Sequence, residues 1–260
     1  MNALQALLLG LIQGLTEFLP VSSSGHLEIG HHLLGVKGHN NLVFAVVVHM
    51  ATVLSTIVVF RKDILELIKG LFAFQWNEST IYISKLVFSA IPVLFLGLFF
   101  KDAIEELFTS NLVLVGSALI FTSILLGATH FAKSGDGKIT FLKAFIIGIA
   151  QAVAVIPGIS RSGSTIATGL LLQNKKENVA RFSFLMVLLP IIGAAFLDIV
   201  GGDITSNESI GLGPLLIGFV AAFVSGLLAC SWMIKIVKRG KLIYFAIYCL
   251  IIGVIAIFAA

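Results

Sequence analysis

Two short polar stretches stand out in an otherwise very apolar sequence. The first, Gly10 to Leu27, reads GLIQGLTEFLPVSSSGHL and holds an amide, a carboxylate, several hydroxyls and an imidazole. The second, Gly148 to Thr165, reads GIAQAVAVIPGISRSGST and holds an arginine among hydroxyls. A charged carboxylate at membrane depth costs roughly 2.5–3.5 kcal/mol even on lenient insertion scales, so Glu17 is a candidate functional residue.

The second stretch repeats the first at a distance of 138 positions. Each copy consists of an apolar run, a proline, and a serine cluster closed by glycine. The coinciding positions are Gly10 with Gly148, Gln13 with Gln151, Ser22 with Ser160, Ser24 with Ser162, and Gly25 with Gly163. The chain therefore carries two related polar tips with different chemistry.

Gln13 and Glu17 are four residues apart, so on a helix they share one face about one turn apart. Their amide and carboxylate oxygens suit a hard cation, Mg²⁺ or Ca²⁺, with water and substrate oxygens completing the shell. The alternative is a polar pair that hydrogen-bonds to the opposite tip.

A serine cluster and a histidine complete the first tip. Ser23 and His26 are three residues apart, and a hydroxyl beside an imidazole is the minimum for an activated nucleophile. His26 could also act as acid, base or nucleophile itself. Serines at a helix start are commonly caps, which is the alternative for Ser22, Ser23 and Ser24.

Arg161 in the second tip is expected at the N-terminus of a short helix, where backbone N–H groups and a planar guanidinium favour phosphate. The alternative is an internal ion pair with Glu17. The hydroxyls expected to bind substrate are those of Ser22, Ser24, Ser160, Ser162 and Thr165. A metal carboxylate, a nucleophile candidate and an arginine cradle are the parts of phosphoryl transfer. In this apolar setting they predict hydrolysis of a phosphate or diphosphate on a lipid.

Composition places the chain among polytopic membrane proteins, with a mean hydropathy of +1.07, 58% apolar residues and 12% charged residues. The basic residues are spread over short loops, which argues against nucleic acid as a partner. Segments long and apolar enough to span a bilayer are 42–60, 82–100, 112–132, 182–200, 214–234 and 242–259. The two polar stretches instead predict re-entrant helical hairpins that turn at Pro20 and Pro157.

Loop charge supports this topology. Fourteen of the 17 Lys and Arg residues fall in loops 61–85, 133–143, 174–181 and 235–241, which would share the cytoplasmic side and leave both termini outside. Each half has three spanning helices, an odd number, so the second half enters from the opposite face. We predict an all-α integral membrane protein of six transmembrane helices and two re-entrant hairpins. It forms a single domain over 1–260, with inverted repeats over about 1–132 and 139–260 whose tips meet near the midplane.

A few polar residues lie outside the two tips. His49 and Asp198 fall inside predicted spans and are expected to be hydrogen-bonded structural residues, although His49 is close enough to the first hairpin to support the site. Glu28 could support His26 or lie at the cavity rim. The loop 61–80 is expected at the cytoplasmic membrane interface.

The two tips closely resemble the undecaprenyl-diphosphate phosphatase family, also known as bacitracin-resistance proteins. Gln13–Glu17 and Pro20–His26 match the family's first motif, and Pro157–Thr165 matches its second, Pro-Gly-x-Ser-Arg-Ser-x-x-Thr, in full. The stretch ARFSFLMVLLPIIGA from Ala180 is also similar. Many members carry Glu where this chain has Gln13, and an amide is a weaker metal ligand, so Glu17 should carry the metal role and Gln13 a lesser one.

The resemblance implies removal of the terminal phosphate of undecaprenyl diphosphate, which regenerates the lipid carrier of cell-wall polysaccharides and confers bacitracin resistance. It also implies a bacterial plasma-membrane enzyme that needs Mg²⁺ or Ca²⁺ and whose site faces the outer side. The implied roles are metal binding for Glu17 and Gln13, nucleophile and acid–base chemistry for Ser23 and His26, and diphosphate contacts for Arg161, Ser160 and Thr165.

The alternative hypothesis is a transporter or flippase of a polyprenyl phosphate, because inverted repeats with broken helices are also typical of carriers. A carrier has no use for a serine and a histidine beside a metal carboxylate, which favours the enzyme. The sequence leaves the oligomeric state open, a homodimer included.

Overall fold

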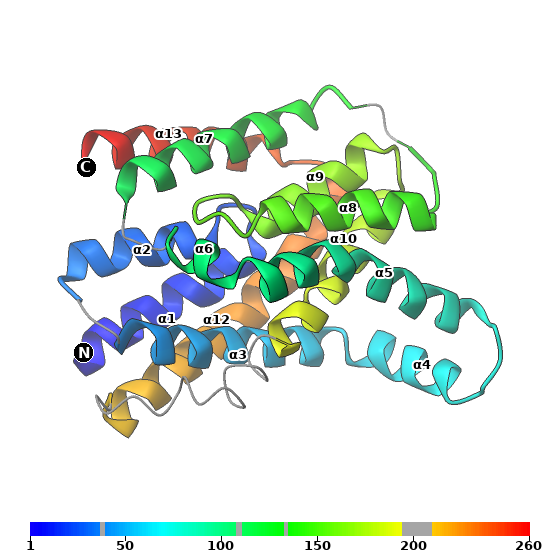
Figure 1. The fold of residues 1–260 in the computed structure, drawn as a ribbon, viewed down its shortest axis with the longest axis horizontal. Helices are drawn as coiled ribbons and strands as arrows, with labels where there is room; N and C mark the ends of the chain where they lie inside the picture. The colour runs from blue at the N-terminus through cyan, green and yellow to red at the C-terminus, as the bar shows by residue number, and fades with distance from the viewer. Residues whose placement is uncertain (37–39, 108–110, 133–134, 194–209) are drawn as a thin grey trace.

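A computed structural model describes residues 1–36, 40–107, 111–132, 135–193 and 210–260 (Figure 1). All regular elements in these residues are helices. In chain order they are α1 (Ala3–Phe18), α2 (Ser23–Leu34), α3 (Asn40–Val59), α4 (Arg61–Leu71), α5 (Glu78–Phe99), α6 (Lys101–Glu105), α7 (Leu112–Ala128), α8 (Phe141–Val153), α9 (Arg161–Leu171), α10 (Lys176–Met186), α12 (Leu212–Arg239) and α13 (Ile243–Phe258).

Five of the six predicted spans coincide with helices, namely α3, α5, α7, α12 and α13. The sixth, 182–200, begins inside α10, which ends at Met186. Helical structure resumes over 188–193, and the rest of this segment, Asp198 included, lies outside the described residues. The prediction of an all-helical fold is therefore confirmed for the part of the chain that the structure describes.

The helices at the predicted spans differ in whether they are long enough to cross a bilayer. Among the described residues, α5 and α12 are long and apolar enough to cross a bilayer, and α3 joins them if it forms one broken span with α4. The bend between α3 and α4 is 77°. The apolar helices α7 and α13 have 17 and 16 residues, which is about 25 Å of helix. α4 occupies most of the predicted interfacial segment 61–80, and its Leu65 and Ile68 are exposed.

Both predicted helical hairpins are present as a helix, a break and a second helix. α1 ends at Phe18, and α2 starts after Ser22, whose hydroxyl accepts a hydrogen bond from the Gly25 N–H at 3.2 Å. α8 ends at Val153, and α9 starts after Ser160, whose hydroxyl accepts from the Gly163 N–H at 3.1 Å. The equivalent serines cap the equivalent helices, because a side-chain oxygen satisfies an N–H group that the first turn leaves free.

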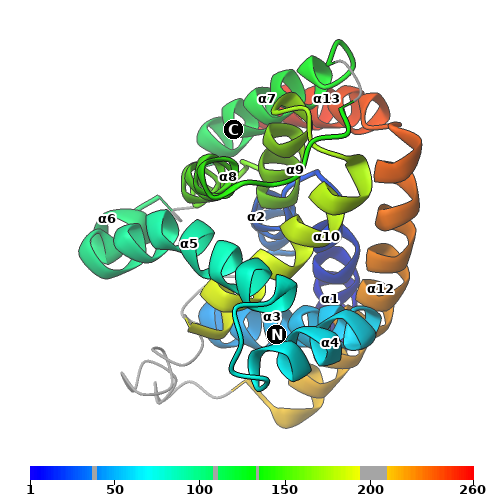
Figure 2. The same cartoon turned by 90° about the vertical axis from the view of Figure 1, so that its right-hand side faces the viewer.

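Glycines let the helices of the two halves pack closely. α1 packs along α12, and α8 packs along α5. A Cβ on Gly10 would lie 2.5 Å from the Gly218 carbonyl oxygen, and a Cβ on Gly148 would overlap the Ser89 carbonyl. α7 and α13 lie side by side in both views (Figures 1 and 2). Helix packing through small residues is typical of membrane proteins, where close backbone approach supplies the dispersion contacts.

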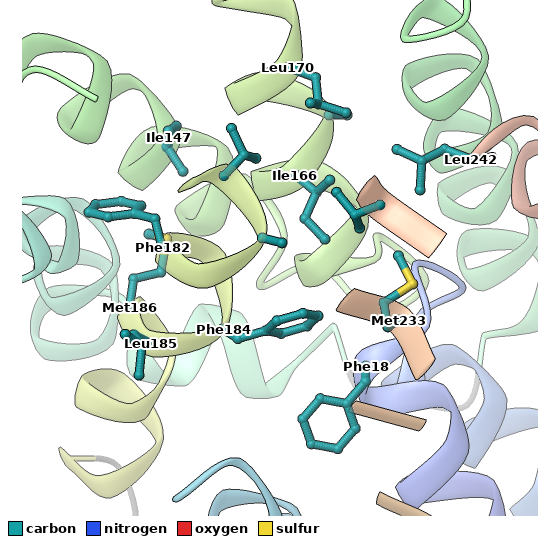
Figure 3. Packing of buried hydrophobic residues seen from close by; sticks show 14 of the residues in the cluster. Phe18, Ile147, Ile166, Leu170, Phe182, Phe184, Leu185, Met186, Met233 and Leu242 are labelled. Atoms are coloured by element: carbon teal, nitrogen blue, oxygen red, sulfur yellow. The ribbon is translucent and has the colours of Figure 1, made fainter. Parts of the chain in front are cut away.

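The apolar core lies where the second hairpin meets α10 and α12. Figure 2 shows α9 and α10 at the centre, with α12, α13, α8, α5 and α3 around them. Figure 3 shows Ile166 of α9, Phe184 of α10 and Met233 of α12 converging with Phe18, the last residue of α1. The Phe18 and Phe184 rings meet edge to face with centroids 5.9 Å apart. This packing fixes the residue next to Glu17 and thereby the position of that carboxylate.

Candidate active site

The two polar tips meet through a buried ion pair. The Arg161 guanidinium, at the first position of α9, donates to Glu17 Oε1 near the end of α1. The Glu17 side chain is 4% exposed. A charge buried this far from water requires a partner, and each of these two residues supplies the other's. The internal ion pair left open by the sequence is the arrangement that the structure shows.

Two further donors converge on the second oxygen of Glu17. The Gln13 amide nitrogen donates to Oε2 at 2.8 Å, from one turn earlier on α1. The Ser23 hydroxyl, at the first position of α2, donates to the same oxygen at 2.6 Å. Gln13 and Glu17 therefore share a helix face as predicted, and the turn at Pro20 brings Ser23 back onto it. A carboxylate that accepts a serine proton at this distance can serve as its base.

His49 of α3 also faces Glu17. Its Nε2 lies 3.8 Å from Glu17 Oε2, and its Nδ1–H donates to the Ala45 carbonyl at 2.8 Å. The bond at Nδ1 fixes the orientation of the ring and leaves Nε2 directed at the carboxylate. The structure thus places His49 beside the site, a role that the sequence had offered as the lesser option.

His26 is turned away from Ser23 in this structure. Its Nδ1–H donates to the Ser22 carbonyl at 2.8 Å, and its Nε2 lies 2.8 Å from the Tyr248 hydroxyl of α13. The His26 and Tyr248 rings are stacked, with centroids 5.6 Å apart and planes 11° apart. Both ring nitrogens are therefore engaged away from the serine, and Ser23 is bonded to Glu17 instead.

The hydroxyls expected to bind substrate divide into two groups. Ser22 and Ser160 are helix caps. Each hydroxyl lies within hydrogen-bond distance of the serine hydroxyl two residues later, which is Ser24 at 3.3 Å and Ser162 at 3.4 Å. Ser162 also donates to the Leu19 carbonyl at 3.1 Å, which ties the second tip to the first. Of the five predicted residues, Ser162 and Thr165 line the pocket described next.

A pocket lies against the ion pair, with a polar and an apolar part. The polar lining comes from Glu17, Thr52, Thr56, Arg161, Ser162, Thr165 and Ser183, and the apolar lining from Phe18, Val53, Phe184, Val187, Leu188 and Ile191. Its free space is about 10 Å³, which is room for about one water molecule. A phosphate would therefore have to separate Arg161 from Glu17 to enter. The lining is polar on one side and apolar on the other, a combination that matches an amphiphilic substrate in kind.

Three polar residues of this pocket were not among the predicted site residues. Thr52 and Thr56 lie one and two turns after His49 on α3, a spacing that puts all three on one helix face. Ser183 of α10 lies 2.5 Å from Thr165, hydroxyl to hydroxyl. The spacing of His49, Thr52 and Thr56 predicts a shared polar face on a helix. The contact between Ser183 and Thr165 cannot be predicted in this way, because it depends on how α10 folds back onto α9.

The tips pack on each other through equivalent residues. A Cβ on Gly25 would lie 3.1 Å from Gly158 Cα, and a Cβ on Gly163 would lie 3.3 Å from Pro20 Cβ. The two contacts are equivalent in the repeat, because Gly25 corresponds to Gly163 and Pro20 corresponds to Gly158. Larger residues at Gly25 or Gly163 would push the tips apart and lengthen the bond between Glu17 and Arg161.

The residues present fit a hard divalent cation. Gln13 Oε1 is buried without a hydrogen-bond partner, next to the Glu17 carboxylate that Gln13 itself bonds. Mg²⁺ is commonly held by one or two protein oxygens together with substrate phosphates, so two oxygens suffice. Within the described residues, no cluster of three His, Cys, Asp or Glu side chains forms a metal site.

The comparisons with known proteins agree on one family. Residues 6–255 match the family model described as bacitracin resistance protein BacA. An undecaprenyl-diphosphatase of Bacteroides fragilis is 54% identical over 261 residues, covering 99% of this chain and 98% of that protein. The undecaprenyl-diphosphatases of Christiangramia forsetii and Carboxydothermus hydrogenoformans are 49% and 41% identical, each covering at least 96% of both chains.

Proposed function

The chain belongs to the bacitracin resistance protein BacA family, and on this premise we propose that it hydrolyses undecaprenyl diphosphate to undecaprenyl phosphate and inorganic phosphate. The observation that carries this proposal is the convergence on Glu17 of a serine hydroxyl from its own tip and a guanidinium from the other. The mixed polar and apolar pocket beside them suits a phosphate on a lipid. Release of the lipid carrier for reuse in cell-wall synthesis accounts for bacitracin resistance, the property for which the family is named.

Ser23 and Glu17 divide the first chemical step between them. The Ser23 hydroxyl transfers its proton to Glu17 Oε2, 2.6 Å away, as its oxygen attacks the terminal phosphorus. The bond from that phosphorus to the bridging oxygen breaks, and undecaprenyl phosphate leaves with the bridging electron pair. Glu17 then releases this proton to the departing phosphate. Water attacks the phosphoserine, and its proton passes through Glu17 to the leaving serine oxygen, which restores Ser23 and releases inorganic phosphate.

Arg161 supplies the positive charge for the diphosphate. In the structure it neutralises Glu17. When substrate enters, the guanidinium exchanges this carboxylate for the phosphate oxygens, for which its planar donors are well matched. The exchange also frees Glu17 Oε1, while Oε2 stays within hydrogen-bond distance of the Ser23 hydroxyl.

Gln13 and Glu17 are the residues that would hold Mg²⁺ or Ca²⁺. A bound divalent cation neutralises charge on the diphosphate and orients its oxygens. The unpartnered Gln13 Oε1 supports this assignment, since a buried acceptor without a donor is costly unless a ligand satisfies it. The family's more common glutamate at this position would hold a cation more strongly than Gln13 does.

The same repeat supports a membrane architecture of six spans and two re-entrant hairpins. The packing of α1 on α12 has its counterpart in α8 on α5, and the caps at Ser22 and Ser160 are equivalent. α7 and α13 meet about a local two-fold axis, because a Cβ on Gly116 would lie 2.6 Å from the Gly253 carbonyl and the reverse contact is 2.7 Å. With the basic loops on the cytoplasmic side, the repeats are inverted and the site faces the outer side of the plasma membrane.

Phosphate release tests the proposed function directly. Purified protein in detergent is given undecaprenyl diphosphate with and without a chelator, beside Arg161→Lys and Glu177→Gln variants. Arg161→Lys keeps the buried charge but not the planar donors, and Glu177 is an exposed carboxylate on α10. We expect release that needs a divalent cation, falls about 10²-fold or more in Arg161→Lys and is unchanged in Glu177→Gln. A wild type that binds the lipid without releasing phosphate would instead favour a lipid carrier.

A further inference from the structure

A second concave region lies between α5, α6 and α8. It is a groove with about 560 Å³ of free space, and its twelve lining residues are all apolar. This volume falls within the roughly 300–1,000 Å³ of ordinary ligand pockets. Apolar walls of this kind gain dispersion contacts from an apolar molecule.

One end of the groove is the tip of the second hairpin. Val155 and Ile156 line this end, and Pro157 follows them directly. Ile156 is five residues before Arg161. Along α8 the wall continues through Ile149 and Val153, which are 45% and 43% exposed. The groove therefore begins at the break between α8 and α9 that leads to Arg161.

The opposite wall is the part of α5 that contains Pro92. Proline has no N–H group, so α5 lacks one internal hydrogen bond there, although the helix continues to Phe99. One turn before Pro92, Ser89 lies against Gly148 in a contact so close that a Cβ would not fit. The groove lies beside this tight contact, next to Pro92 of α5.

We propose that this groove binds the isoprene units nearest the diphosphate, while the diphosphate itself lies between Arg161 and Glu17. The inference rests on the proposed function. A substrate held by its head at the hairpin tip needs an apolar surface for its tail that starts at that tip, and the groove starts there. The lining residues of the groove include no polar side chain, which suits a hydrocarbon tail.

Substitutions that narrow the groove can be made without touching the polar site. Ile149→Trp and Val153→Trp place a large ring in the groove from outward-facing positions of α8. Leu142→Trp is the matched control, on the same helix, 69% exposed and outside the groove. KM and kcat are measured with undecaprenyl diphosphate and with methyl diphosphate, a short substrate that has the same head and no isoprene unit.

We expect both groove variants to raise KM for undecaprenyl diphosphate about tenfold or more with kcat nearly unchanged, because removing a fitted apolar contact weakens binding by this order. KM for the short substrate should stay within about twofold, and Leu142→Trp should behave as wild type. Undecaprenyl diphosphate with a diazirine on its first isoprene units should crosslink to α5 and α8 in the wild type and much less in Val153→Trp.

Two results separate this inference from the proposed function. Unchanged KM in active groove variants, or crosslinks that map to other helices, would overturn the tail site alone. Loss of a co-purifying glycerophospholipid from the variants, again with unchanged KM, would assign the groove to a bilayer acyl chain. No hydrolysis of either substrate by the wild type would overturn the proposed function and this inference together.

Discussion

At the scale of single residues, Glu17 connects every part of the site. It accepts from Gln13, Ser23 and Arg161, and His49 lies 3.8 Å away. A carboxylate with this many partners is well suited to two successive tasks. It pairs with Arg161 in the structure, and in the proposed reaction it accepts the Ser23 proton.

Replacing Glu17 by Gln tests this double role. The variant keeps the shape of the side chain but cannot accept the Ser23 proton or pair with Arg161, so we expect kcat to fall about 10²–10⁴-fold. Glu177→Gln, an exposed carboxylate with lysine partners, should leave kcat unchanged. Steady-state phosphate release measures both, and a Glu17→Gln enzyme with near wild-type kcat would rule Glu17 out as the base.

The roles of His26 and Ser23 can be separated in the same assay. Because His26 bonds to Ser22 and Tyr248 rather than to Ser23, we expect His26→Gln to lower kcat about tenfold or less, and Tyr248→Phe to have a similar effect. Ser23→Ala should lower kcat by orders of magnitude more. If His26→Gln were as inactive as Ser23→Ala while Tyr248→Phe was normal, His26 would have a chemical role that its position here does not show.

The sequence predicted that the two tips meet, but not how their residues pair. It offered an ion pair between Glu17 and Arg161 only as the alternative to a ligand anion bound by Arg161, and the structure shows this ion pair. The orientation of His26 depends on Tyr248, which is 222 residues away and has no counterpart in the motif. A pairing that relies on such a distant residue cannot be read from local spacing.

At the scale of elements, the helices are placed by small residues and by caps. Gly116 of α7 and Gly253 of α13 meet backbone to backbone, and Gly10 of α1 meets Gly218 of α12. Apolar runs were enough to predict α3, α5, α7, α12 and α13. The break after Met186 was not predicted, because the apolar composition continues through it. The 77° bend between α3 and α4 was not predicted, because it depends on packing.

Two glycines on one helix give a matched test of this packing. A Cβ on Gly116 would lie 2.6 Å from backbone of α13, so Gly116→Ala should destabilise the protein by about 1–3 kcal/mol. Gly127, also on α7, has nothing within 4 Å, so Gly127→Ala should be neutral or stabilise slightly through helix propensity. Thermal unfolding midpoints in one detergent compare them, and equal midpoints would contradict the close α7–α13 contact.

At the scale of the whole molecule, the sequence repeat and its equivalent packing explain how two distant motifs come together. Each half contributes one hairpin, and the hairpins meet tip to tip through Gly25 with Gly158 and Gly163 with Pro20. In the proposed reaction the first half supplies the base and the nucleophile, and the second supplies the cationic cradle. Divergence of two equivalent tips accounts for Arg161 having no basic counterpart in the first.

Labelling from one side of the membrane tests the orientation. Cys230 and Cys249 are buried, so introduced cysteines can be followed. We expect a membrane-impermeant maleimide to label Ala259→Cys in right-side-out vesicles, and to label Lys69→Cys after permeabilisation. Both positions are exposed in the structure. Labelling of Lys69→Cys in sealed vesicles would place the basic loops outside and reverse the proposed topology.

The central claim is that both tips form one site in which Ser23 attacks the terminal phosphorus. The most direct measurement is rapid quenching of the enzyme with undecaprenyl diphosphate labelled in its terminal phosphate, followed by mass spectrometry of the labelled peptide. The account predicts phosphate on Ser23 in the wild type and its absence in Arg161→Lys, where the head group is not held. Label on His26 alone, or turnover with no labelled peptide at any quench time, would contradict it.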